Sequence, residues 1–205
     1  MLERFRQVWA RILTPIADFL LRRGVSPDAV TVVGTLGVVL GAVICFPQGW
    51  LWQGVVVVLV FVFSDMVDGQ MAKSSGRASS WGAFLDSSLD RFGDAAVFGG
   101  ILLYFAGPRH SVLWASVALA ALVFGQITSY VKARAESLGF TAGGGLAARA
   151  DRLVLILLGA LLTGLGVPYV LEICTAVIAV ATLVTVFQRI AKVQRQAKPK
   201  DVRTA

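Results

Sequence analysis

The stretch 64–90, SDMVDGQMAKSSGRASSWGAFLDSSLD, joins two apolar segments of this 205-residue chain and carries four acids. Asp65 and Asp68 close a nearly unbroken apolar run, and Asp86 and Asp90 open the next one. Residues three or four apart share a face of a helix, so each pair directs its carboxylates to one side. A hairpin between the two helices would therefore bring all four acids together.

Four carboxylates at short range repel one another strongly unless a cation compensates their charge. The stretch contains no Cys or His, and hard oxygen ligands favour Mg²⁺, Mn²⁺ or Ca²⁺ over zinc. Gly69 and Gly82 lack side chains beside the acids and leave room for a ligand or a second helix. The alternative, that the acids only cap helix ends, is disfavoured because acids within membrane spans are functional by default. The sequence therefore predicts a divalent metal site.

The spacing of this stretch is Asp-x2-Asp-Gly-x2-Ala-Lys-x8-Gly-x3-Asp-x3-Asp, from residue 65 to residue 90. It resembles the signature of the CDP-alcohol phosphotransferase family, which usually has Arg where this chain has Lys73. The other seven of the eight fixed positions match. Lysine keeps the positive charge but lacks the planar guanidinium that can bind phosphate through two parallel bonds.

The composition predicts an all-α, polytopic membrane protein. Hydrophobic residues make up 57% of the chain and charged residues 15%, whereas soluble domains carry about a quarter charged residues. The mean hydropathy is +0.76, and several apolar stretches approach the ~20 residues that a spanning helix needs. We expect six transmembrane helices, at about residues 30–46, 50–72, 81–105, 111–135, 150–165 and 169–190.

Residues 1–24 interleave apolar and arginine side chains at helical spacing, which predicts an amphipathic helix in the membrane interface. A helix packed on the rest of the domain is the alternative. We expect a catalytic transmembrane domain at 25–195 and a basic tail at 196–205. The segment 139–149, with three consecutive glycines, is predicted to be a flexible linker.

The formal net charge of +7 favours anionic lipid rather than nucleic acid as a partner, because basic residues of membrane proteins gather on the cytoplasmic side. Six spans would place both termini and the loops 73–80 and 136–150 on one side. Nearly every Lys and Arg lies on that side, and the opposite turns hold only Arg109. This bias predicts a multi-pass plasma-membrane protein with its active site and both termini in the cytoplasm.

The family resemblance implies an enzyme that displaces CMP from a CDP-linked lipid with Mg²⁺, or Mn²⁺, as cofactor. It also implies a homodimer. By the same resemblance Asp65, Asp68 and Asp86 are metal ligands, and Asp90 is both a ligand and the general base. The positions implied to hold the CDP-lipid are Asp28, Ala29, Val30, Thr31, Gly69, Lys73 and Ser79.

Three cations, Lys132, Arg152 and Arg189, lie at the expected cytoplasmic ends of the last three spans. Together they could hold a phosphate on the acceptor, although each could instead be ordinary flanking charge. The run 130–136 and the pair Arg149 and Arg152 resemble the actinobacterial phosphatidylinositol phosphate synthases within the family. That branch uses CDP-diacylglycerol and myo-inositol phosphate, which makes this lipid and this acceptor the expected substrates.

Two alternatives stay open at this point. A phosphatidylglycerophosphate synthase, whose acceptor is glycerol phosphate, also takes a phosphorylated acceptor. A divalent-cation transporter could use the same acids, but it would need them near mid-membrane with broken helices there. The acids of this chain are expected at one end of the spans.

Overall fold

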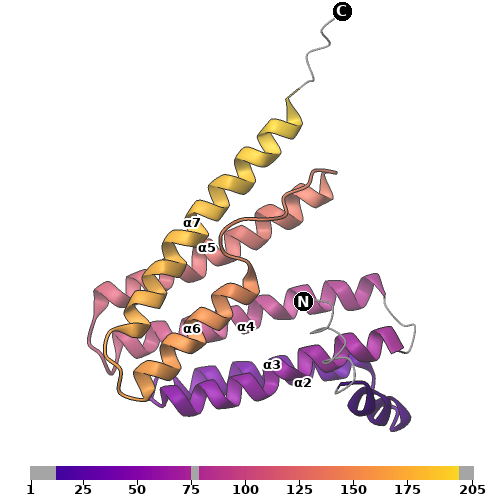
Figure 1. The fold of residues 1–205 in the computed structure, drawn as a ribbon, viewed down its shortest axis with the longest axis horizontal. Helices are drawn as coiled ribbons and strands as arrows, with labels where there is room; N and C mark the ends of the chain where they lie inside the picture. Colours follow the sequence, from indigo (N-terminus) through magenta and orange to yellow (C-terminus); the bar gives the residue numbers. More distant parts are fainter. Residues whose placement is uncertain (1–12, 75–78, 199–205) are drawn as a thin grey trace, which may run out of the picture. The chain divides into compact units, whose positions relative to one another are not determined.

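Figure 1 shows the computed structural model, which describes residues 13–74 and 79–198, apart from the side chains of Asp65, Met66 and Lys73. Every regular element within these ranges is a helix, so the prediction of an all-α chain is confirmed. Residues 13–22 form a helical segment ahead of α2. The elements that follow are α2 (Pro27–Cys45), α3 (Leu51–Ser74), α4 (Ser80–Ala106), α5 (Val112–Ser137), α6 (Arg149–Gly164) and α7 (Val170–Ala197).

Four of these helices are long and apolar enough to cross a membrane: α2, α3 as far as Ala72, α5 and α7. The helix α4 has 27 residues, but Asp90, Arg91 and Asp94 interrupt its apolar part. The helix α6 has 16 residues, fewer than the ~20 that span a bilayer. The membrane character is therefore supported by length and composition, and the count of six spans stays a prediction.

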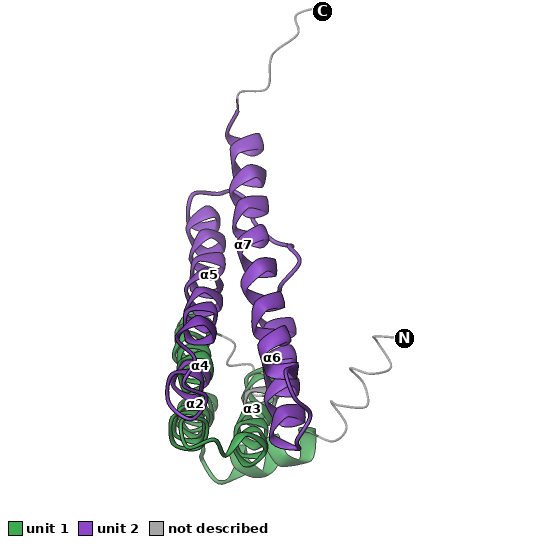
Figure 2. Ribbon diagram, turned by 90° about the vertical axis from the view of Figure 1, so that its left-hand side faces the viewer, with its two compact units in different colours: residues 1–100 green, residues 101–205 purple. Residues whose placement is uncertain are grey.

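The chain divides into two compact units, residues 1–100 and residues 101–205, with the boundary inside α4 (Figure 2). The first unit contains α2, α3 and most of α4. The second contains the end of α4 with α5, α6 and α7. The domain limits expected at 24/25 and 195/196 stay predictions.

In the first unit, α2 and α3 pack closely because glycines of α2 receive bulky side chains of α3. A Cβ atom at Gly37 would collide with the ring of Phe61, and one at Gly41 would lie 2.6 Å from Cγ1 of Val57. Residue numbers rise along α2 as they fall along α3, so the two helices are antiparallel. Helices in lipid associate through this kind of close contact, since lipid tails remove the hydrophobic driving force between them.

The helical segment 13–22 packs on α3. Leu13 and Ala17 form a buried cluster with Val67 and Met71, and Nε2 of Gln70 donates a hydrogen bond to Oγ1 of Thr14 at 3.2 Å. The opposite side of the segment leaves Ile16 and Phe19 exposed. One face is thus docked on the domain, as the alternative interpretation expected. The interfacial position of residues 1–24 stays a prediction, and residues 1–12 lie outside the described ranges.

In the second unit, α7 packs against both α5 and α6. The helix α6 approaches closely at Gly159, where a Cβ would lie 3.0 Å from Cβ of Cys174. Near the start of α7, Nη2 of Arg109 lies 2.9 Å from Oε1 of Glu172, whose side chain is 3% exposed. The other carboxylate oxygen of Glu172 has no hydrogen-bond partner within the described part of the chain.

The segment between α5 and α6 does not hang free. Backbone groups of Thr141, Gly143, Gly144 and Ala147 form hydrogen bonds with side chains of α7. The segment predicted to be a flexible linker is therefore held against α7 through its backbone.

Candidate active site

Asp68 occupies a buried position near the C-terminal end of α3, with 8% of its surface exposed. The hydroxyl of Thr31, on α2, donates a hydrogen bond to Oδ2 of Asp68. Thr31 is also buried, and its hydroxyl lies 3.2 Å from the carbonyl oxygen of Pro27. Burying a carboxylate is costly unless hydrogen bonds or a cation compensate it. The α2–α3 contact therefore holds one acid of the predicted cluster in a defined place.

Asp86 and Asp90 lie one turn apart on α4, close enough to Asp68 for their charges to repel its carboxylate. The charges of these two acids therefore reach Asp68 from the other side of the loop, and the gathering of all four acids stays a prediction. The side chain of Asp65 is outside the described set. Among the side chains that are described, no group of three His, Cys, Asp or Glu residues is arranged to hold a metal ion. The four-carboxylate metal site therefore stays a prediction.

The chemistry of these groups fits a hard divalent cation. Asp68, Asp86 and Asp90 offer only oxygen, and the stretch that carries them contains no Cys or His. Mg²⁺ and Mn²⁺ prefer such ligands. A cation would also offset the mutual repulsion that the carboxylates otherwise experience in a partly buried site.

The first turns of α2 and α4 lie side by side at Gly82. A Cβ there would lie 3.4 Å from Oγ of Ser79 and 3.7 Å from Oδ1 of Asp28. Oγ of Ser26 accepts the N–H of Ala29 at 3.2 Å, and Oγ of Ser79 accepts the N–H of Gly82 at 3.0 Å. The positive dipole ends of two helices therefore lie near each other, which favours an anion.

The residues predicted to hold the CDP-lipid are only partly gathered at this place. Asp28 and Ser79 flank Gly82, and Thr31 contacts Asp68. Gly69 is exposed with open space around it. Val30 packs instead against the buried cluster under the segment 13–22. The side chain of Lys73 lies outside the described set, and Ala29 contributes its N–H to the cap of α2.

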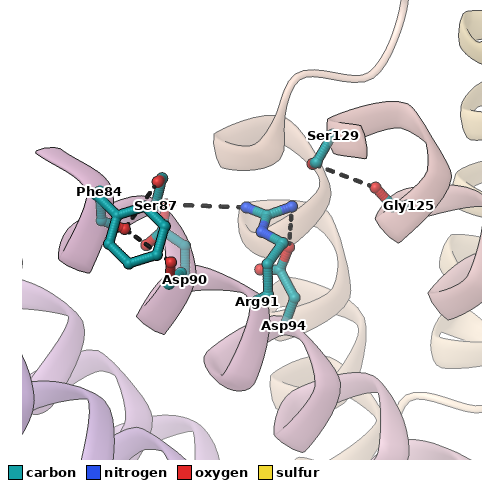
Figure 3. Close-up of polar contacts among 8 residues, drawn as sticks. Phe84, Ser87, Asp90, Arg91, Asp94, Gly125 and Ser129 are labelled. Carbon is teal, nitrogen blue, oxygen red and sulfur yellow. Dashed lines mark hydrogen bonds and ion pairs between the residues drawn. The ribbon is translucent and has the colours of Figure 1, made fainter. Parts of the chain in front are cut away.

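Sequence reasoning missed an ion-paired group directly after Asp90. Nη1 of Arg91 lies 3.4 Å from Oδ2 of Asp94, and its Nη2 lies 3.8 Å from Oδ2 of Asp90 (Figure 3). The side chain of Asp94 is 6% exposed, whereas that of Arg91 is 28% exposed. The signal was present in the spacing, because Asp94 follows Asp90 by the same four residues that separate Asp90 from Asp86. Arg91 thus supplies positive charge on the helix that carries three acids.

The second unit arranges the three predicted acceptor cations along α5. Atoms of Arg152 lie 3.6 Å from where a Cβ of Gly125 would be, and Nη1 of Arg189 donates to the carbonyl oxygen of Thr128 at 2.7 Å. Lys132 lies one turn beyond Thr128, on the same face of the helix, and pairs with Glu136 at 3.8 Å. Arg152 and Arg189 thus contact α5 one turn apart, and the convergence of all three side chains stays a prediction. Their role in binding an acceptor stays a prediction.

Burial distinguishes the three cations. Arg152 is 3% exposed, whereas the side chain of Lys132 is 49% exposed. Around the same turn of α5, Oγ of Ser129 donates to the carbonyl oxygen of Gly125 at 3.4 Å (Figure 3). Burying an arginine is costly unless its charge is compensated, so Arg152 is the one of the three whose position the surrounding structure restrains most.

Comparisons with known proteins agree with the motif. The sequence model of the family described as CDP-alcohol phosphatidyltransferase matches residues 24–188. The phosphatidylinositol phosphate synthase of Cutibacterium acnes is 55% identical over 203 residues, which cover 95% of this chain and 98% of that relative.

Solved structures agree as well. The crystal structure of Mycobacterium tuberculosis phosphatidylinositol phosphate synthase with CDP-DAG bound is similar at a TM-score of 0.88 and 39% identity, covering 95% of this chain and 98% of that one. A crystal structure of the same mycobacterial protein in complex with manganese and citrate has a TM-score of 0.85 and 39% identity, covering 94% and 93%. This chain belongs to the CDP-alcohol phosphatidyltransferase family.

Proposed function

We propose that the chain is a membrane phosphotransferase that moves the phosphatidyl group of CDP-diacylglycerol to myo-inositol phosphate, giving phosphatidylinositol phosphate and CMP. The observation that carries this proposal is the buried Asp68, whose carboxylate accepts a hydrogen bond from Thr31 on the neighbouring helix. Similarity to phosphatidylinositol phosphate synthases, one of them with CDP-DAG bound, supports the same activity.

In the proposed reaction an acceptor hydroxyl oxygen attacks the lipid-side phosphorus of CDP-diacylglycerol. The bond between that phosphorus and the CMP oxygen breaks, and the hydroxyl proton passes to Asp90 as general base. Direct displacement of this kind needs no covalent enzyme intermediate. Arg91 forms ion pairs with Asp90 and Asp94 and would thereby restrain the carboxylate of Asp90.

Asp65, Asp68, Asp86 and Asp90 would hold the divalent cation, Mg²⁺ or Mn²⁺. When bound, such a cation neutralises charge on phosphate oxygens. The similar structure in complex with manganese supports a divalent metal. Thr31 contributes by orienting Asp68 through its hydrogen bond, which is the usual task of a residue that contacts a metal ligand.

The CDP moiety would bind where α2 and α4 begin. Two helix N-termini and the hydroxyl of Ser79 offer donors for the diphosphate, and Gly82 leaves space beside Asp28. Lys73 supplies charge and Gly69 supplies room on the α3 side. Lys132, Arg152 and Arg189 would hold the acceptor's phosphate.

The finer placement in the membrane is part of this proposal. We infer six spans with the active site and both termini on the cytoplasmic side, from the positive-inside distribution of Lys and Arg. We also infer a homodimer, from family resemblance alone.

An acceptor screen with the purified full chain tests the function. CDP-diacylglycerol and Mg²⁺ are mixed with inositol phosphate, free inositol or glycerol phosphate, and CMP release is measured. We expect inositol phosphate to support the fastest release and free inositol to support little, since it offers the cations no phosphate. Faster release with glycerol phosphate would identify glycerol phosphate as the acceptor, and the assignment as a phosphotransferase would stand. No CMP release with any of the three would overturn the proposed function.

A further inference from the structure

One face of α7 carries four side chains that bond to the segment between α5 and α6. They recur at intervals of four, three and four residues, which places them on one side of the helix. Each contacts a backbone group of residues 141–147, so together they hold the path of the loop. They are Thr185, which accepts the N–H of Ala147 at 3.2 Å, Arg189, which donates to Gly144 O at 3.0 Å, Lys192, which donates to Gly143 O at 2.9 Å, and Gln196, which bonds Thr141.

Gln196 makes the most complete of these contacts. Its Oε1 accepts the N–H of Thr141 at 2.9 Å and the hydroxyl of Thr141 at 3.1 Å. Its Nε2 donates to the carbonyl oxygen of Thr141 at 2.7 Å. Both backbone groups of one loop residue are therefore satisfied by a single amide side chain.

Gly145 lets the loop approach α7. Its φ of +122° disfavours any L side chain, and a Cβ at this position would collide with the methyl group of Thr185. The hydroxyl of Thr185 donates to Ala181 O at 2.7 Å, which directs a lone pair toward the N–H of Ala147. The contact is thus built from both sides, by a glycine on the loop and an oriented hydroxyl on the helix.

The held segment leads directly into the helix that carries Arg152. The N–H of Ala148 donates to Oδ2 of Asp151 at 3.2 Å, which closes the start of α6. Arg152 lies in that first turn, and Arg189 also donates a hydrogen bond to the carbonyl oxygen of Thr128 on α5. The start of α6 is therefore positioned from α7 through the loop.

We propose that Lys192 and Gln196 are positioning residues for the acceptor, acting through residues 141–147 on Arg152. This inference rests on the proposed function, because it assigns Arg152 to the acceptor's phosphate. Lys192 and Gln196 are themselves solvent-exposed, so their hydrogen bonds contribute little to the stability of the whole fold. Their loss should act locally, by freeing the start of α6.

The test compares Lys192→Ala and Gln196→Ala with Arg195→Ala and Gln194→Ala, which remove similar side chains from the same part of α7. Gln194 and Arg195 make no side-chain hydrogen bond to the loop within the described residues. One lost hydrogen bond shifts an equilibrium by about two- to tenfold. We therefore expect the KM for inositol phosphate to rise at least about threefold in the first two variants, with the KM for CDP-diacylglycerol unchanged. The two control variants should match the wild type.

A second variant tests the donor specifically. Gln196→Glu keeps the acceptor oxygen for Thr141 N–H but replaces the Nε2 donor with an oxygen that repels the carbonyl oxygen of Thr141, so its KM for inositol phosphate should rise at least as much as in Gln196→Ala. Hydrogen exchange of the Thr141 amide provides a readout that does not depend on activity. Exchange should accelerate in Gln196→Ala and stay slow in Gln194→Ala.

The outcomes are distinct. Faster exchange together with a higher acceptor KM supports the proposal. Faster exchange with unchanged KM for both substrates overturns it, and so does an equal rise in the KM of both. Absence of CMP release by wild-type protein with inositol phosphate would instead count against the proposed function.

Discussion

Thr31→Val exchanges a hydroxyl for a methyl group of similar size and removes the hydrogen bond to Asp68. Both side chains are buried, at 7% and 8% exposure, so water is poorly placed to replace the lost donor. The carboxylate then has to be oriented by the metal itself. We expect the affinity for Mn²⁺ or Mg²⁺ to fall.

The magnitude follows from the kind of bond that is lost. A hydrogen bond to a charged group contributes about 1.5–3 kcal/mol, which corresponds to roughly ten- to a hundredfold in an equilibrium constant. Loss of a group that orients a metal ligand typically lowers metal affinity by a similar factor. The concentration of Mn²⁺ giving half-maximal CMP release should therefore rise about ten- to a hundredfold.

The assay measures CMP release against Mn²⁺ concentration at saturating CDP-diacylglycerol, with direct Mn²⁺ binding by electron paramagnetic resonance as a second readout. Thr31→Ser is the matched control, because it keeps the hydroxyl and should stay within a few-fold of wild type. Equal Mn²⁺ dependence in Thr31→Val and wild type would refute the reasoning. A defect confined to the KM for CDP-diacylglycerol would make Thr31 a nucleotide contact instead.

Four further results are expected. Chelation with EDTA should abolish CMP release, Mg²⁺ or Mn²⁺ should restore it, and zinc alone should not; turnover that survives exhaustive chelation would contradict the carboxylate site. Asp90→Asn should lower turnover by at least ~10²-fold while CDP-lipid still binds, and loss of binding together with activity would make Asp90 chiefly a metal ligand. Arg152→Ala should raise the acceptor KM about ten- to a hundredfold, with little change in the KM for CDP-diacylglycerol. A larger effect of Lys132→Ala would show that the exposed lysine contributes more to acceptor binding than the buried arginine. Arg109→Ala should destabilise the detergent-solubilised protein by about 2–3 kcal/mol, less than the full cost of breaking a buried pair because Arg109 is partly exposed. Adding Glu172→Gln should recover part of that loss in a thermal-unfolding assay, whereas additive losses would show that the two side chains act independently.

Helix positions were largely predictable from hydropathy, and the exceptions have physical causes. The helix α2 begins three residues before the apolar run expected from residue 30, because Ser26 caps it and Pro27 suits its first turn. The helix α7 continues to Ala197, seven residues beyond its apolar end. Hydropathy reports where lipid contact ends, whereas a helix can continue in polar surroundings when its side chains bond to another segment.

The helices that carry the acids of the candidate site were predictable from the sequence, because Asp65 and Asp68 end one apolar run and Asp86 and Asp90 begin the next. The bond between Thr31 and Asp68 was not, since it depends on how α2 is aligned along α3, and Thr31 had been assigned only to the nucleotide. Arg91 and Asp94 were missed although Asp94 continues the four-residue spacing. Lys192 and Gln196 resemble any solvated residues near the end of a helix, and their partners are backbone atoms that a sequence pattern does not reveal.

The glycines of α2 have a consequence for the metal site that lies beyond their packing. Phe61 packs at Gly37 and Val57 packs at Gly41. To slide along α2, α3 would have to break both contacts at the same time. The nearest alternative seating is a full turn away, about 5.4 Å, and at that seating Thr31 could not reach Asp68. Gly37 lies about 9 Å along the helix axis from Thr31, and the atoms nearest to a Cβ added there belong to Phe61 rather than to an acid. A methyl group added at Gly37 should nonetheless impair the active site, because it would shift α3 along α2 and move Asp68 away from Thr31.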